Sequence, residues 1–151
     1  MKVRLESVEQ TQQWGDRLGR LLQAGDLLIL TGGLGAGKTT LTQGIALGLQ
    51  VRGPITSPTF VIVRVHPSVV SGPSLVHVDA YRLGSAVEID DLDLDSALDD
   101  VVIIVEWGAG LAETLAGQRL ELQIDAVGNR RTITLLPTGK RFDRLVEELQ
   151  G

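Results

Sequence analysis

The stretch that decides the fold is residues 27–49, LLILTGGLGAGKTTLTQGIALGL. It opens with a short apolar run, residues 27–30, which is bounded by turn-forming residues and predicts a buried strand. A glycine-rich loop follows, and residues 38–49 are predicted to form a helix. The loop, residues 32–39, matches G-x-x-x-x-G-K-[ST], the phosphate-binding (Walker A) pattern, in the strand–loop–helix context that this pattern requires.

The residue types of this loop suit the binding of a nucleoside triphosphate. Glycines allow successive backbone N–H groups to turn inward around phosphate oxygens, because no Cβ obstructs the required dihedral angles. The start of the following helix directs further N–H groups and a positive dipole end at the same anion. Lys38 adds a full charge for the β- and γ-phosphates, and the Thr39 hydroxyl can ligate Mg²⁺. A Mg²⁺–nucleotide, most simply ATP, is the expected ligand.

Two acidic residues are candidates to complete the site. Glu106 directly follows the apolar run 101–105, and Asp79 follows the strand predicted over residues 75–78. An ionised carboxylate at the end of a core strand is costly unless it is paired or bound to a metal, so either position suggests function. If one acid ligates Mg²⁺, the other would orient the attacking water. Thr59 lies in a loop before a strand, where its hydroxyl could contact the γ-phosphate or simply form part of a turn.

The rest of the chain alternates between strand and helix patterns. Ser7 and Gln10 form a capping box before a helix, further strands are predicted over residues 60–65 and 75–79, and an acidic helical stretch covers residues 87–100. Two late strands, residues 119–126 and 131–136, flank a Gly128-Asn129 turn and precede a final helix. The pattern predicts a single domain, residues 1–151, with an α/β three-layer fold whose central sheet is mostly parallel and partly an antiparallel hairpin.

Composition narrows the classes of function. The 151 residues carry a formal net charge of −5 and no Cys. The charge provides no general attraction to nucleic acid or to an anionic membrane, and the lack of Cys excludes disulfides and thiolate metal sites. No apolar run approaches the length of a membrane span, so the cytoplasm is the expected location.

Two other possible metal sites fail on their residue types. Asp91, Asp93 and Asp95 resemble the start of a calcium-binding loop, but Ser96 occupies the position where that loop requires glycine. His66 and His77 are the only histidines, which is too few for a convincing zinc site.

Four motifs in order resemble one family. They are GGLGAGKTTL at residues 32–41, TSPTF at 56–60, HVDAYRL at 77–83 and VEWG at 105–108. Together they resemble the bacterial TsaE (formerly YjeE) family, the P-loop ATPases of tRNA threonylcarbamoyladenosine biosynthesis. The resemblance implies ATP and Mg²⁺ as cofactors and slow ATP hydrolysis by the chain alone. It also implies association with TsaD-like and TsaB-like proteins, which modify the adenosine beside the anticodon of ANN-decoding tRNAs, so that tRNA is contacted only through the complex.

The resemblance also implies roles for individual residues. Lys38, Asp79 and Glu106 would be catalytic, Thr39 and Glu106 would hold Mg²⁺, and Thr11 would lie near the adenine. Asp79 and Thr59 would shape a switch-like part of the site, and either Arg130 or Arg131 would approach the nucleotide. The full set implied to bind the nucleotide is Thr11, Gly33, Leu34, Gly35, Ala36, Gly37, Lys38, Thr39, Thr40 and Thr59.

Two positions depart from the family pattern. The family usually has an acid where this chain has Gly33, and often Glu where it has Ala109. Loss of the acid at Gly33 would weaken hydrolysis or shift that role to Asp79 or Glu106, without affecting the phosphate loop.

Two other classes use the same loop. A small-molecule kinase would need an acceptor pocket and usually an arginine-rich lid, whereas the only adjacent Arg pair here is Arg130-Arg131. A guanine-specific switch would carry N-K-x-D, which the sequence lacks.

Overall fold

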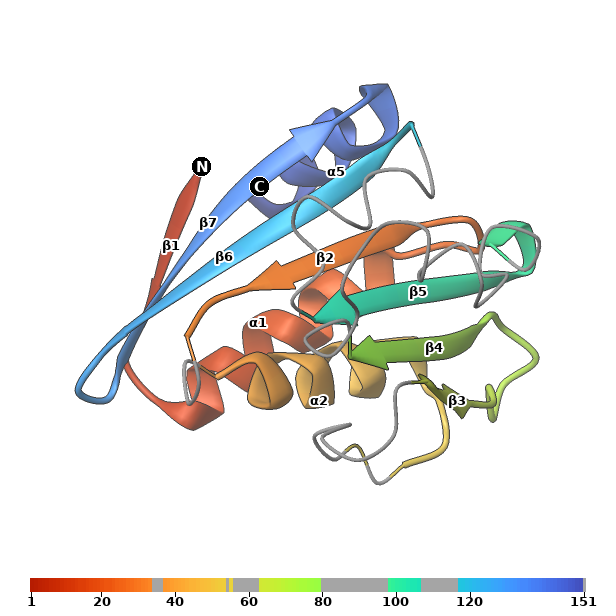
Figure 1. Ribbon diagram of the computed structural model, residues 1–151, viewed down its shortest axis with the longest axis horizontal. Helices are drawn as coiled ribbons and strands as arrows, with labels where there is room; N and C mark the ends of the chain where they lie inside the picture. Colours follow the sequence, from red (N-terminus) through yellow and green to blue (C-terminus); the bar gives the residue numbers. More distant parts are fainter. Residues whose placement is uncertain (34–36, 54, 56–62, 80–97, 107–116, 151) are drawn as a thin grey trace.

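Figure 1 shows the computed structural model of the chain, which describes residues 1–33, 37–53, 55, 63–79, 98–106 and 117–150. Its elements, in chain order, are β1 (Lys2–Leu5), α1 (Val8–Leu21), β2 (Leu27–Thr31), α2 (Lys38–Leu49), β3 (Val63–His66), β4 (Ser74–Asp79), the short 3₁₀ helix η1 (Leu98–Asp100), β5 (Val101–Glu106), β6 (Arg119–Val127), β7 (Arg130–Thr138) and α5 (Lys140–Gln150).

The described strands form one seven-stranded sheet in the order β1-β7-β6-β2-β5-β4-β3. The central strands β6, β2, β5 and β4 are parallel to one another. The outer pairs β1–β7, β6–β7 and β3–β4 are antiparallel. The α/β class, the parallel centre and the late antiparallel hairpin are therefore confirmed. The pairing of β3 with β4 adds a second antiparallel pair that the sequence did not predict.

Most predicted elements have the expected bounds. Helix α2 begins at Lys38 and ends at Leu49, as predicted, and Ser7 caps α1 by accepting a hydrogen bond from the Gln10 N–H. Strand β3 starts at Val63, and residues 60–62 of the predicted strand lie outside the described residues. Of the predicted helix at 87–100, only η1 falls within them. Strand β1 was not predicted, because it is four residues long and only its last residue, Leu5, is buried.

The described helices share one hydrophobic cluster on one face of the sheet. This cluster contains Leu28 and Leu30 of β2 together with Leu18 of α1, Leu41 of α2 and Phe142 of α5. The alternate residues of the central strands, such as Leu27, Ile29 and Ile103, are also fully buried. Two of the three predicted layers, the sheet and the helices on one of its faces, are thus described.

Helices α1 and α2 pack with their backbones in contact. A Cβ added to Gly19 of α1 would overlap the Ile45 carbonyl oxygen, and one added to Gly48 of α2 would overlap the Asp16 carbonyl oxygen. Such a close approach requires glycine on both helices. The same holds nearer the helix starts, where a Cβ added to Gly44 of α2 would overlap the Gln12 carbonyl oxygen of α1. The start of α1 is therefore held beside the start of α2.

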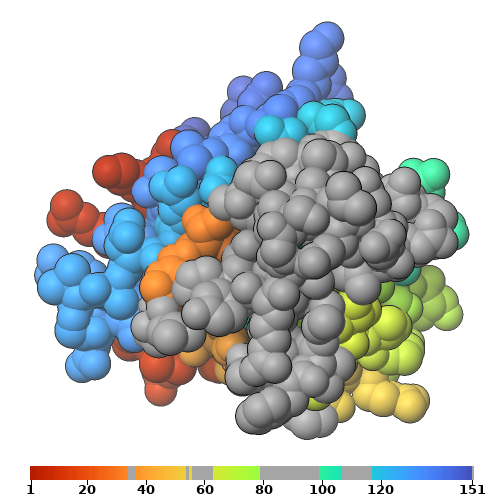
Figure 2. Space-filling view, in the orientation of Figure 1, coloured from red at the N-terminus to blue at the C-terminus, as the bar shows by residue number. Residues whose placement is uncertain are grey.

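The two edges of the sheet lie on opposite sides of the molecule. On the face in Figure 2, the β6–β7 hairpin (blue) lies at one side and β3 and β4 (yellow-green) at the other. Strand β2 (orange) lies between them. In the part of the chain described, no helix is long and apolar enough to cross a membrane.

Candidate nucleotide-binding site

The phosphate-binding loop joins the end of β2 to the start of α2, as the sequence predicted. Gly37 is the N-cap of α2 and has φ = 106°, a left-handed conformation that favours glycine. Because Gly37 has no side chain to cap the helix, the first N–H groups of α2 remain available to an anion. Leu34, Gly35 and Ala36 lie outside the described residues.

Lys38 places a buried charge at the end of this loop, where α2 begins. Its side chain is only slightly accessible, and its Nζ donates hydrogen bonds of 2.9 Å to the carbonyl oxygens of both Gly32 and Gly33. A buried ammonium group is tolerated only when such partners surround it. The loop carbonyls therefore fix the ammonium beside the predicted phosphate site.

The threonines that follow Lys38 lie in the first turn of α2. Thr39 and Thr40 are both partly accessible, which leaves their side chains within reach of a ligand at the helix start. Gly33 is exposed, and a Cβ built on it has no atom of the described residues within 4 Å. The backbone here does not exclude the acidic side chain that the family usually has.

Glu106 is a buried carboxylate at the carboxyl end of β5. It is 3% exposed, and its Cα pairs with Leu30 of β2 on one side and with Asp79 of β4 on the other. The two predicted acids are therefore neighbours, next to the strand that leads into the phosphate loop. The Asp79 side chain and all of Thr59 and Ala109 lie outside the part described.

The structure adds a partner for Glu106 that the sequence analysis missed. His77 of β4 is fully buried, and its Nε2 lies 3.1 Å from Glu106 Oε2. The sequence analysis considered the histidines only as zinc ligands. The signal that could have found this contact is the period of two in a strand, which places His77 on the same face of β4 as the predicted site residue Asp79.

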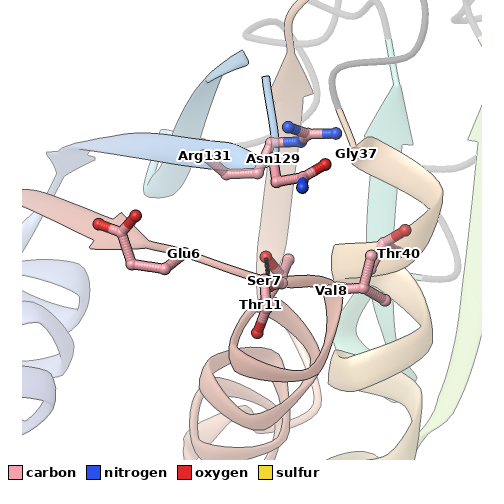
Figure 3. A pocket seen from close by; sticks show the side chains of 8 residues that line it. All are labelled: Glu6, Ser7, Val8, Thr11, Gly37, Thr40, Asn129 and Arg131. Carbon is pink, nitrogen blue, oxygen red and sulfur yellow. Dashed lines mark hydrogen bonds between the residues drawn. The ribbon is translucent and has the colours of Figure 1, made fainter. Parts of the chain in front are cut away.

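A cavity of about 290 Å³ adjoins the phosphate loop (Figure 3). Three separate segments line it: the start of α1, the start of α2 and the β6–β7 turn. Its lining residues are Glu6, Ser7, Val8, Thr11, Gly37, Thr40, Asn129 and Arg131. Thr11 and Thr40, both implied to bind nucleotide, thus share one cavity with Gly37. The structure adds Glu6, Ser7, Val8 and Asn129, which sequence reasoning did not identify.

The two arginines of the β6–β7 turn have different environments. The Arg131 side chain lies against the phosphate loop, since a Cβ added to Gly37 would be 3.2 Å from Arg131 Nε. Its guanidinium donates to the carbonyl oxygen of Gly128 at 2.8 Å. Arg130 instead pairs with Glu6 through exposed side chains, with Nε and Oε2 3.1 Å apart. Arg131 is therefore the arginine that faces both the cavity and the loop.

The acidic groups fit a metal that arrives with a nucleotide. Among the described residues, no group of three or more His, Asp or Glu side chains could hold a metal ion alone. Mg²⁺ usually takes one or two protein ligands and completes its shell with phosphate oxygens and water. The buried Glu106 carboxylate and the Thr39 hydroxyl suit such a site, whereas the Asp91, Asp93 and Asp95 segment lies outside the described residues.

The chain is similar to known proteins over most of its length. Residues 5–133 match the model of the family "Threonylcarbamoyl adenosine biosynthesis protein TsaE". The tRNA threonylcarbamoyladenosine biosynthesis protein TsaE of Streptomyces coelicolor is 58% identical over 87% of this chain and 93% of its own length. The protein of the same name from Mycobacterium tuberculosis H37Rv is 50% identical over 85% of this chain and 80% of its own. A crystal structure of Bacillus subtilis YdiB is 32% identical, covers 99% of this chain and 93% of that one, and superimposes with a TM-score of 0.81. The motifs, the fold and these matches together place the chain in the TsaE family.

Proposed function

We propose that this chain binds Mg²⁺–ATP and hydrolyses it slowly, as an accessory protein in the formation of threonylcarbamoyladenosine in tRNA. The observation that carries the ATP-binding part is the buried Lys38 ammonium group. Two loop carbonyls hold it at the start of a helix that no side chain caps. This arrangement suits a polyphosphate, because it offers N–H donors and a fixed cation to the same anion. Membership of the TsaE family supports the process in which the chain acts.

The triphosphate would lie across the loop and the start of α2. The loop N–H groups and Lys38 would bind its phosphate oxygens, and Arg131 would approach them from the β6–β7 turn. Thr39 and Glu106 would hold Mg²⁺, which supplies positive charge to the β- and γ-phosphate oxygens when bound. Asp79, the neighbour of Glu106 in the sheet, would orient the attacking water, with Thr59 beside the γ-phosphate.

The cavity beside the loop is proposed to bind the adenine. The Thr11 hydroxyl donates to the Ser7 carbonyl oxygen at 3.1 Å, so its lone pairs can accept a further hydrogen bond. Adenine presents an amino donor at the position where guanine presents a carbonyl acceptor. An acceptor here therefore favours ATP over GTP, and competitive binding of the two nucleotides tests this preference on the unmodified protein.

The proposed partners are TsaD-like and TsaB-like proteins of the same organism. With a net charge of −5, the chain is better suited to protein partners than to gripping tRNA alone, so tRNA contact is proposed only through the complex. The cytoplasm is the proposed location. Co-purification with these two proteins, with and without ATP, tests the association, and no enrichment in either condition would contradict it.

Calorimetry with Mg²⁺–ATP tests the central proposal. Replacing Lys38 with Ala should abolish measurable binding, because it removes the cation and leaves the loop carbonyls unpaired. The matched control is Lys140→Ala, since Lys140 also begins a helix directly after a left-handed glycine, Gly139, but is exposed and remote from the loop. Equal affinity of the wild-type protein and the Lys38→Ala variant would overturn the proposal.

A further inference from the structure

The contact between His77 and Glu106 joins two neighbouring strands beside the phosphate loop. In the pairing of β4 with β5, the Cα of His77 lies opposite that of Ile104, two residues before Glu106. Side chains two residues apart on a strand share a face, and this is the face that packs against the helices, since Ile104 belongs to their cluster. His77 and Glu106 therefore meet diagonally across the strand pair, and both are buried.

From this contact we infer that His77 is a positioning residue for the Glu106 carboxylate. The inference rests on the proposed role of Glu106 in holding nucleotide-bound Mg²⁺. An ionised carboxylate can only accept hydrogen bonds, so the proton of this contact belongs to His77 Nε2. A hydrogen bond to Oε2 fixes the rotation of the carboxylate and leaves Oε1 to the metal. Carboxylates that ligate metals are commonly held by such outer hydrogen bonds.

A packing role does not account for a histidine at this position. His77 lies between Val76 and Val78 in a strand interior where an aliphatic side chain would satisfy burial. Its Nδ1 is also buried, and among the described residues no atom pairs with it. A buried polar atom without a partner is unfavourable, so this side chain is retained at some loss of stability. Within the described part of the chain, its one hydrogen bond is to Glu106.

The other histidine supplies a matched control. His66 of β3 is also buried, and its Nδ1 bonds to the carbonyl oxygen of Arg52 at 3.0 Å, while its Nε2 has no partner among the described residues. Both histidines are thus buried, and each makes one hydrogen bond to a described residue. They differ in that only His77 contacts Glu106.

The first experiment measures ADP affinity by calorimetry, with Mg²⁺ and with EDTA. His77→Leu removes the donor, His77→Gln retains an N–H donor on a side chain of similar reach, and His66→Gln is the control. His77→Leu should reduce the gain in affinity due to Mg²⁺ by about 10- to 100-fold, the usual effect of losing an outer partner of a metal ligand. Its affinity in EDTA should be unchanged, His77→Gln should recover most of the gain, and His66→Gln should retain all of it.

Two results would overturn the inference: a full Mg²⁺ effect in His77→Leu, or an equal loss of affinity with and without Mg²⁺. Failure of the wild-type protein to bind ADP at all would instead refute the proposed function, so the two failures are distinguishable.

The second experiment uses the unmodified protein and needs no variant of His77 to fold. The chain has only two histidines, so an imidazole ¹⁵N NMR spectrum contains two ring systems, which His66→Gln assigns. His77 should show a proton on Nε2, and its resonances should move when Mg²⁺ is added to the ADP-bound protein. A proton on Nδ1 alone, or resonances that Mg²⁺ leaves unmoved, would refute a donor role toward Glu106.

Discussion

Replacing Gly48 with Ala tests whether the contact between α1 and α2 supports the nucleotide site. The added Cβ would overlap the Asp16 carbonyl oxygen and would lie 2.8 Å from Arg20 N and 2.9 Å from Gly19 Cα. All three are backbone atoms, so no side-chain rotation relieves the overlap and the helices must move apart. Overpacking of this kind costs about 1–3 kcal/mol. Ala is favoured over Gly within a helix by about 1 kcal/mol, which offsets only part of that cost.

Because three backbone atoms are met at once, we expect a cost at the upper end of that range, about 2–3 kcal/mol. The net loss is then about 1–2 kcal/mol, which lowers the melting temperature by roughly 2–8 °C in a protein of this size. Thermal unfolding followed by circular dichroism measures it. The control is Gly117→Ala, where a Cβ meets no described atom within 4 Å. Moving α1 also displaces Thr11 from Thr40 across the cavity, so ATP affinity should fall in the folded Gly48→Ala protein. A Gly48→Ala variant as stable as the Gly117→Ala protein would refute the close-packing argument.

Three further predictions follow from single residues. Glu106→Gln should remove the gain in nucleotide affinity due to Mg²⁺ while leaving binding in EDTA intact; a retained gain, measured by calorimetry, would make Asp79 the metal ligand instead. Gly33→Asp should raise the rate of phosphate release above that of both the wild-type protein and the Gly33→Asn variant. The position has room for a Cβ, and only the charged variant restores the acid. Equal rates would show that hydrolysis does not depend on an acid at this position. Burial lowers the pKa of His66, against the opposing effect of its hydrogen bond to the Arg52 carbonyl. A histidine whose pKa is depressed in the folded state stabilises the fold above its unfolded-state pKa of about 6.5, and this contribution is lost as the pH falls. The His66→Gln variant should therefore show a smaller decline of the melting temperature below that pH. An unchanged slope would contradict this prediction.

The parts of the structure that local sequence determines were predictable. Strand β2 and helix α2 were predicted within one residue of their ends, because an apolar run, a left-handed glycine and a helix start follow one another in the chain. Glu106 was predicted as a site residue for the same reason, since it ends the most apolar strand. These features depend on neighbours in sequence, which periodicity and turn residues report directly.

The parts that depend on strand pairing were not predictable from one sequence. Nothing in residues 2–5 indicates that β1 extends the sheet beside β7, and nothing near His77 indicates that β4 and β5 are neighbours. The cavity is the extreme case, because Ser7 and Asn129 meet there from opposite ends of the chain. Which of Arg130 and Arg131 faces the loop likewise depends on the pairing of β7 with both β6 and β1.

The phosphate half and the base half of the proposed ligand depend on different parts of the sequence. The phosphate part of the site is built by consecutive residues, so a short motif is enough to recognise it. The base part needs α1 to reach the start of α2, and the helices approach that closely because four glycines leave no side chain between them: Gly15 and Gly19 of α1, and Gly44 and Gly48 of α2. Glycines that do not line the cavity thus help to decide whether Thr11 shares it with Gly37. Base preference should therefore respond to changes in helix packing that leave phosphate binding intact.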